Sequence, residues 1–305
     1  MQIYSTVAKL CDKHSNIAIA LGTFDGIHIG HQKIIGRAVE LAKNCGGTSV
    51  VFTFSNHPLS IVDPTRCPIQ LVTNEYKAEL MLDLGVDILM NIPFTAELLK
   101  MSPTDFIELL RSNLNPTNIV VGPNYSFGFR SAGTPNLLAQ AGNAHHFNVE
   151  VHPAVYLDGN IVSSTLIRQH ISEGNVSEAA RLLGRNFKLK GEVVTGDKRG
   201  RTLGFPTANI NIPDGFAVPD NGVYAVSTSF DTMTYNSIAN IGTNPTFKGN
   251  NRHIEVHLLD FDGNLYGKSI TVEFLAKIRD EKTFSGANDL IKQISQDIAT
   301  ARNYY

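Results

Sequence analysis

The sequence lacks several features that would point to a particular class of protein. Its 305 residues include only three cysteines, Cys11, Cys45 and Cys67, and none has C-x-x-C spacing. We therefore expect reduced cysteines and no metal cluster built on them. The chain also has no internal repeat and no low-complexity tract, so neither a solenoid nor a disordered tail is expected.

An excess of charge and a long apolar run are missing as well. The formal net charge is −2, with 42% hydrophobic and 18% charged residues. Without a basic excess, we expect no nucleic acid as the main partner and no adhesion to an anionic membrane. No apolar run approaches spanning length, and the first residues show no signal-peptide pattern. We expect a cytoplasmic protein, a monomer or weak homo-oligomer, whose partners are small molecules.

What the sequence does contain indicates two domains, for which its length is sufficient. Up to residue 184, apolar strand-like runs alternate with helical patterns, which predicts an α/β domain with a parallel sheet over 1–184. Short strands, glycines and turns follow, so a small antiparallel β-barrel with a terminal helix is expected over 185–305. There, segments 253–261 and 269–275 flank Asp262-Gly263-Asn264, a sequence typical of a hairpin turn.

One glycine-rich stretch, Leu21–His31, lies between a strand-like run and a helical pattern from residue 31 to 45. Gly22 and Gly30 allow the backbone to approach a ligand closely, and the start of the helix offers free N–H groups to a phosphate. His28 and His31 are three residues apart, so both imidazoles can point at the same phosphate oxygens and stabilise a transition state.

The spacing in this stretch matches neither the Walker pattern nor the dinucleotide pattern G-x-G-x-x-G. Two other interpretations stay open. The histidines could bind zinc, although no third ligand of the usual kind is nearby, or they could be structural residues of a glycine-rich turn.

The stretch resembles the H-x-G-H signature of the nucleotidylyltransferase superfamily. Its longer form, G-T-F-D-G-x-H-x-G-H, is similar to the bacterial FAD synthetase branch. The resemblance implies a Rossmann-like domain in which His28 and His31 are catalytic. It also implies ATP contacts from Gly22, Phe24, Asp25 and Gly30.

A second candidate region is the loop that follows the strand-like run Asn118–Gly122. In an open α/β sheet it would face the same crevice as the histidines. Asn124 could recognise a base or hold the loop, and the aromatic residues could stack on a flat ring or form a lid. The loop resembles the corresponding loop of FAD synthetases, which implies that Asn124, Phe127 and, after an earlier strand, Pro58 bind the flavin.

A third region, Ile161–Arg168, has consecutive hydroxyl groups at an expected helix start. These groups can cap the helix or bind phosphate, and Arg168 adds a fixed positive charge; a plain capped helix is the alternative. The region is similar to the S-S-T-x-I-R motif of the same superfamily. This implies that Ser163, Ser164 and Thr165 bind ATP phosphates and that Arg168 takes part in catalysis.

In the second half, segment 196–209 combines glycines with basic residues. Gly196 and Arg201 could belong to a flap over phosphates, and a solvated hairpin loop is the alternative. Thr207 and Asn209 are two residues apart, so on an extended segment they project to one face and suit Mg²⁺.

Motifs across this half, among them G-R-x-L-G-F-P-T-A-N and N-I-G-T-x-P-T-F, resemble riboflavin kinase. The resemblance implies that Thr207 and Asn209 help to bind Mg²⁺ and ATP, and that Glu255 is the general base. From the residues alone, Glu255 is one carboxylate of an alternating strand, which is more often a solvated position.

Taken together, the resemblances imply two reactions. The second half would convert riboflavin and ATP to FMN, and the first would convert FMN and ATP to FAD and pyrophosphate. Two rivals remain: nucleotidyl transfer to another phosphate, and a flavin-binding regulator without turnover. The regulator lacks an obvious output, because no helix-turn-helix or basic surface is recognisable.

Overall fold

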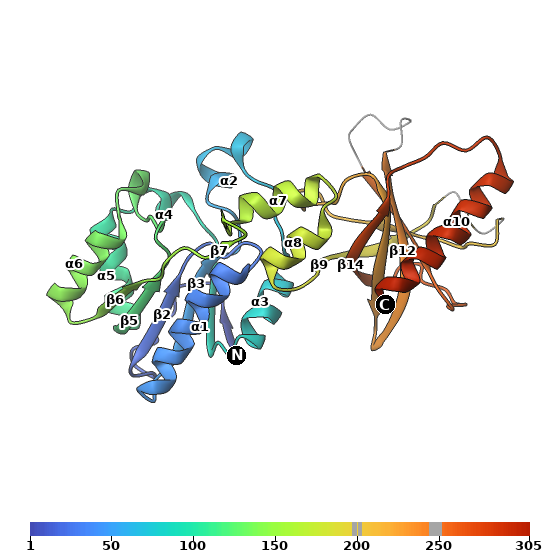
Figure 1. The fold of residues 1–305 in the computed structure, drawn as a ribbon. Coiled ribbons are helices and arrows are strands. Elements are labelled where there is room, and N and C mark those ends of the chain that lie inside the picture. The colour runs from blue at the N-terminus through green and yellow to red at the C-terminus, as the bar shows by residue number, and fades with distance from the viewer. Residues whose placement is uncertain (197–199, 201–202, 244–251) are drawn as a thin grey trace. The chain divides into compact units, whose positions relative to one another are not determined.

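The computed structural model describes residues 1–196, 200, 203–243 and 252–305 (Figure 1). The contacts between residues divide the chain into a first unit, Met1–Ser163, and a second unit, Ser164–Tyr305. No helix of the described residues is long and apolar enough to cross a bilayer.

The first unit is built on a parallel sheet with the strand order β1-β4-β3-β2-β5-β6. All five residues of β2 are buried, as predicted for a strand covered on both faces. The chain leaves β2 toward β3 and later returns on its other side as β5, so a topological switch point lies at β2 and β5. The strands are β1 (Gln2–Tyr4), β2 (Ile17–Leu21), β3 (Ser49–Phe54), β4 (Ile88–Ile92), β5 (Pro116–Val121) and β6 (Asn148–Val151).

Helices cover both faces of this sheet (Figure 1). α1 (Ile29–Asn44) and α3 (Asn74–Asp83) pack on one face, whereas α5 (Pro103–Leu114) and α6 (Pro135–His145) pack on the other. Ser102 caps α5, since its Oγ accepts a hydrogen bond from the Asp105 backbone N–H at 3.1 Å. Shorter elements are α2 (Leu59–Val62), η1 (Pro64–Arg66), α4 (Ala96–Lys100), η2 (Phe129–Ser131), β7 (Tyr156–Leu157) and β8 (Asn160–Ile161).

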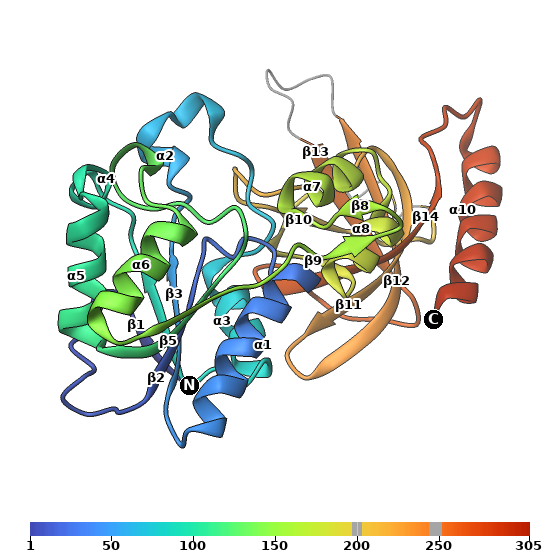
Figure 2. The same ribbon diagram turned by 60° about the vertical axis from the view of Figure 1, so that its left-hand side comes forward.

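The second unit is a closed antiparallel barrel with the order β10-β13-β12-β11-β14-β9, which confirms the predicted fold class. Helix α10 (Ala287–Ala301) packs outside it against β11, β12 and β14 (Figure 2). The other elements are α7 (Ser164–Ser172), α8 (Val176–Leu183), β9 (Phe187–Val194), β10 (Ala208–Asn211), β11 (Gly222–Phe230), β12 (Met233–Thr243), β13 (Arg252–Leu258), β14 (Ser269–Arg279) and η3 (Arg302–Tyr304).

The expected hairpin between segments 253–261 and 269–275 is wrong. β13 pairs with β10 and β12, whereas β14 pairs with β9 and β11, so the two strands are not neighbours. Residues 259–268 form a long connection rather than a tight turn. Asp262-Gly263-Asn264 bends this connection, but a local turn signal does not decide which strands pair.

An ion pair holds α10 on the barrel. The Arg279 guanidinium donates to both carboxylate oxygens of Asp297 at 2.8 to 3.1 Å, and Gln293 Nε2 donates to the same carboxylate at 2.9 Å. The Asp297 side chain is only 3% exposed. A buried carboxylate on the barrel-facing side of this helix is therefore tied to β14.

The division between the two units falls earlier than the domain boundary expected at residues 184 and 185. Helices α7 and α8 belong to the second unit, and α8 packs against β9 and β14. A boundary between the two functional domains at residue 184 stays a prediction.

Candidate active sites

The glycine-rich turn of the first unit lies between β2 and α1, at the carboxyl end of the sheet. Two of its residues, Phe24 and Ile27, have φ values of 46° and 40°, in the left-handed region that β-branched and bulky residues rarely adopt. Both side chains are buried. The turn is therefore strained and over-determined by its surroundings, a combination that is common at functional sites.

His28 caps α1, which begins at Ile29, two residues before the helix expected from the sequence. The Nδ1 atom of His28 accepts a hydrogen bond from the His31 backbone N–H at 3.2 Å. A neutral His28 ring must then carry its proton on Nε2, the atom that can donate to a phosphate.

The two imidazole rings lie together as the sequence predicts. Their centroids are 3.6 Å apart and their planes are inclined by 18°. Gly30 permits this arrangement, because a Cβ atom there would lie 3.1 Å from the His28 ring. Phe24 meets the His31 ring edge-on at a centroid distance of 5.2 Å.

His31 is in an environment that disfavours its charged form. Burial, followed by the charges of His28 and Lys77, holds the pKa of His31 well below its ordinary value. Its Nδ1 atom is buried and has no hydrogen-bond partner within the described part of the chain. A neutral ring with an unsatisfied nitrogen can act as an acceptor or donor for an incoming ligand.

The other predicted ATP contacts of this turn have structural roles. A Cβ atom at Gly22 would lie 2.8 Å from the Phe24 ring, so glycine gives that ring its space. Asp25 Oδ1 accepts a hydrogen bond from the Leu71 backbone N–H at 3.1 Å. The turn is thereby anchored to the segment that precedes α3.

Of the predicted flavin contacts, Asn124 is exposed in the turn after β5, the strand next to β2. The Phe127 ring is buried and packs against Phe106 and Tyr125 at centroid distances of 5.3 and 5.6 Å. Pro58 precedes α2. Asn124 thus follows one of the two strands at the switch point, whereas the Phe127 ring is part of the core.

The predicted phosphate motif falls on the division between the units. Ser163 ends the first unit, and Ser164, Thr165 and Arg168 lie in α7 of the second. The expected helix start is confirmed, because α7 begins at Ser164.

In the barrel, the strand register brings three predicted residues together. Asn209 of β10 pairs with Glu255 of β13, and Thr207 Oγ1 donates to Glu255 Oε2 at 3.5 Å. Gly196 lies against Asn209, since a Cβ atom there would be 2.1 Å from the Asn209 amide nitrogen. Hydroxyl, amide and carboxylate oxygens are the donors that Mg²⁺ prefers, so this set fits the ion.

Asn240 is a neighbour of Glu255 that the sequence analysis missed. It lies on β12 directly opposite Glu255, so Asn209 and Asn240 flank the carboxylate from both adjacent strands. Only the pairing of β12 with β13 reveals this position.

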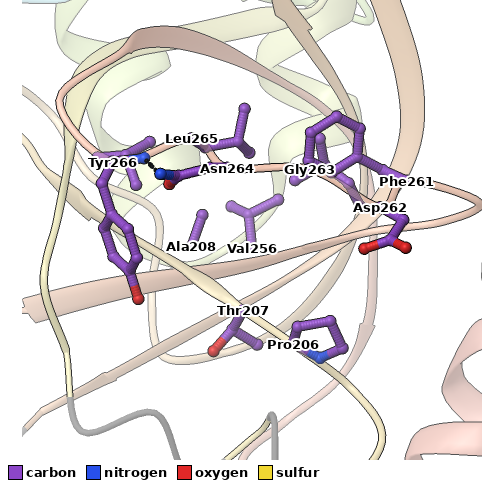
Figure 3. Close-up of a pocket in the computed structure, with 12 residues that line it drawn as sticks. Pro206, Thr207, Ala208, Val256, Phe261, Asp262, Gly263, Asn264, Leu265 and Tyr266 are labelled. Carbon is purple, nitrogen blue, oxygen red and sulfur yellow. Dashed lines mark hydrogen bonds between the residues drawn. The ribbon is translucent and has the colours of Figure 1, made fainter.

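A cavity of about 460 Å³ opens beside Thr207 (Figure 3). Inward-facing residues of β10 and β13, such as Ala208 and Val256, form its floor. The connection between β13 and β14 forms its wall, with Tyr266 N–H donating to Asn264 Oδ1 at 3.0 Å. Of the three oxygen donors, only Thr207 lines the cavity, so a substrate part held there would lie beside the Thr207 side chain.

Arg201, predicted to contact phosphate, lies outside the described residues. Across the part of the chain that is described, no group of three or more His, Cys, Asp or Glu side chains could hold a metal ion. The described residues therefore supply no third ligand of this kind for a zinc ion bound by the two histidines.

Family comparisons match both halves. The FAD synthetase model matches residues 11–166, and the riboflavin kinase model matches residues 183–305. Among curated proteins, the bifunctional riboflavin kinase/FMN adenylyltransferase of Listeria monocytogenes is 37% identical over 95% of this chain and 93% of that protein. Those of Bacillus subtilis and Escherichia coli are 36% and 34% identical, covering 96% and 94% of this chain and 94% and 92% of theirs.

A solved structure from Streptococcus pneumoniae, described as a macrolide-efflux protein, has the same fold over the full length of both chains. Its TM-score is 0.91 and its sequence identity is 30%.

Proposed function

The chain belongs to the bifunctional riboflavin kinase/FMN adenylyltransferase family, and on this premise we propose which residues carry each reaction. The C-terminal domain phosphorylates riboflavin to FMN with ATP, and the N-terminal domain adenylylates FMN to FAD with release of pyrophosphate. Both matched families are enzyme families, and the efflux in the name of the streptococcal structure refers to that protein alone.

For adenylyl transfer we propose His28 and His31 as the catalytic pair. The observation that carries this proposal is their stacked position at the N-terminus of α1, at the switch point of the sheet. An oxygen of the FMN phosphate attacks the α-phosphorus of ATP, and pyrophosphate leaves. His28 Nε2–H, His31 and the helix N–H groups stabilise the negative charge that develops there.

The remaining residues of this proposal bind and orient the substrates. Gly22, Phe24, Asp25 and Gly30 shape the turn around ATP, and Asn124, Phe127 and Pro58 belong to the flavin side. Ser163, Ser164, Thr165 and Arg168 supply hydroxyl groups, helix N–H groups and a positive charge suited to the departing pyrophosphate.

For the kinase we propose Glu255 as the general base. It accepts the proton of the riboflavin 5′-hydroxyl, whose oxygen attacks the γ-phosphorus of ATP while ADP leaves. Asn209 and Thr207 would hold Mg²⁺, which neutralises phosphate charge when bound. Gly196 and Arg201 belong to the phosphate flap, and the cavity beside Thr207 would accept part of a substrate.

This proposal includes a cytoplasmic protein with small-molecule substrates, consistent with two reactions that consume ATP. Its test uses two single variants of the full chain, His28→Ala and Glu255→Gln. Each is incubated with ATP and Mg²⁺ and with riboflavin or FMN, and FMN and FAD are separated.

We expect His28→Ala to slow FAD formation from FMN by about 10² to 10³-fold, the effect of removing one oxyanion-type donor, and to leave FMN formation intact. Glu255→Gln should slow FMN formation from riboflavin and leave FAD formation from FMN intact. The activity that each variant retains shows that its chain is folded. FAD formation unchanged in His28→Ala would remove the histidine from the mechanism, and binding of flavin without turnover in the parent protein would favour a regulator.

A further inference from the structure

Lys77 is a buried charge that the proposed mechanism does not use. Its side chain projects from α3 and is only 6% exposed. The ammonium nitrogen donates to the backbone oxygen of Phe54 at 2.9 Å and to that of Thr23 at 3.4 Å. Thr23 lies in the glycine-rich turn after β2, and Phe54 ends β3. One side chain therefore ties the turn to the carboxyl end of the neighbouring strand.

The turn requires such a tie because its backbone is strained at Phe24 and Ile27. Thr53 Oγ1 also donates to the Thr23 oxygen, at 2.9 Å. Gln32 Nε2 donates to the Ile27 oxygen at 2.9 Å. The carbonyl groups on both sides of the strained segment are thus held by side chains from β3, α3 and α1.

The position of the tie links it to the histidine pair. Phe24 directly follows Thr23, and its ring meets the edge of the His31 ring. A shift of the Thr23 carbonyl would move Phe24 and remove the contact that fixes one side of His31. Misplacement of a catalytic group by about 1 Å can reduce a rate by about 10²-fold.

Stability alone does not account for a lysine at this position. Burial lowers the pKa of Lys77 to about 8, against the opposing influence of the nearby Asp25 carboxylate. The charged form is therefore less stable here than in water. Buried ionisable groups with strongly shifted pKa values are common at functional sites.

We propose that Lys77 is a positioning residue for adenylyl transfer, which holds the Thr23 carbonyl and places a positive charge near His31. The inference rests on the proposed role of His28 and His31. Lys77 does not reach the substrate, and it acts through the turn and through the electrostatics of His31.

The test compares Lys77→Met with Lys77→Arg in the full chain. Methionine is unbranched like lysine and only one atom shorter, and it removes both the charge and the donors, whereas arginine keeps both. We expect Lys77→Met to lower the kcat of FAD formation from FMN by about 10²-fold, with FMN formation from riboflavin unchanged, and Lys77→Arg to recover a large part of that loss. Lys43→Met, at an exposed position of α1, is the matched control.

A second measurement separates positioning from mere support of the fold. The charged groups that lower the pKa of His31 are His28 and Lys77, and Asp25 is the charge that acts on Lys77. Removal of the Lys77 charge should therefore raise the pKa of His31. An NMR titration of ¹³C-labelled histidine should show this rise in Lys77→Met and not in Lys77→Arg.

The proposal is overturned if the rate of FAD formation in Lys77→Met is within twofold of the parent rate. It is also overturned if His31 titrates in Lys77→Met as it does in the parent protein. If Lys77→Met fails to fold, the proposal is tested on Thr53→Val and Lys77→Arg instead. Thr53→Val removes the other hydrogen-bond donor to the Thr23 carbonyl, and it must slow FAD formation without slowing FMN formation. In Lys77→Arg, His31 must titrate as it does in the parent protein. Adenylylation that is intact in His28→Ala would refute the proposed function instead, whatever Lys77 does.

Discussion

The stacked histidines show how a residue type acquires a role through its position. His28 serves as a helix cap through Nδ1, and this hydrogen bond fixes the orientation of its ring beside His31. Gly30 supplies the space for the ring. The spacing of the two histidines was sufficient to predict that they lie together, because residues three apart at a helix start share one side.

Lys77 and Asn240 could not be identified in the same way. A lysine in a helix is normally taken as exposed, and the only signal was that Lys77 precedes the buried Met81 by four residues, on the same helix face. Asn240 becomes a neighbour of Glu255 only through the pairing of two strands. Both positions depend on tertiary contacts that a sequence pattern does not contain.

The buried Lys77 predicts a pH dependence of stability. In the folded protein its pKa is about 8, and in the unfolded chain it returns to 10.5. Below pH 8 Lys77 is protonated in both the folded and the unfolded state, and its burial then destabilises the fold fully. Between pH 8 and 10.5 the unfolded chain binds more protons than the folded protein, so the free energy of unfolding rises with pH. The slope is about 1.4 kcal/mol per pH unit for this one group.

Urea unfolding of the parent protein and of Lys77→Met between pH 7 and 10 measures this effect. We expect the parent to gain stability relative to the variant above pH 8. Lys43→Met should follow the parent at every pH. A difference between parent and Lys77→Met that does not change with pH would contradict the prediction.

At the scale of elements, periodicity and turn residues predicted most of the strands and helices. They failed where pairing is decided at a distance: the expected hairpin between β13 and β14 does not exist, because other strands lie between them in the barrel. The connection that replaces it forms one wall of the cavity beside Thr207. The part of the site made by this connection was therefore not predictable from local sequence.

The attachment of α10 gives a prediction at this scale. Asp297→Ala leaves the Arg279 guanidinium largely buried without its partner, and breaking one side of such a pair costs about 3 to 5 kcal/mol. We expect the barrel to lose stability by this amount in thermal or urea unfolding. Asp289→Ala, at an exposed position in the first turn of the same helix, is the control and should have a much smaller effect.

The Arg279→Met/Asp297→Leu double variant tests the cause. Because it removes both charges together, it should be more stable than Asp297→Ala. Equal stability of the two variants would show that the ion pair is not the origin of the loss.

At the scale of the whole molecule, the alternation of strands and helices predicted the parallel sheet, and the later run of short strands predicted the barrel. The number and order of strands in each sheet came only from the structure. The division of the chain at Ser163 and Ser164 was not visible in the sequence, because α7 and α8 continue the helical pattern of the first unit but pack with the second.

Two separately catalysed reactions in one chain predict complementation in trans. Neither His28→Ala nor Glu255→Gln should make FAD efficiently from riboflavin, because each lacks one step. A mixture of the two variants should restore FAD formation, since FMN made by one chain can diffuse to the other. A mixture no more active than its components would show instead that FMN does not leave the chain that makes it.

The closed barrel has one more consequence, for the behaviour of concentrated solutions. Every strand of the barrel is paired on both sides, whereas the parallel sheet ends in two open edges, β1 and β6. An open edge offers unpaired N–H and C=O groups to a strand of another molecule. Of the two large sheets in the described part of the chain, only the parallel one can therefore accept a further strand, at β1 or β6, and the shortness of these edges, three and four residues, limits how firmly a foreign strand can attach.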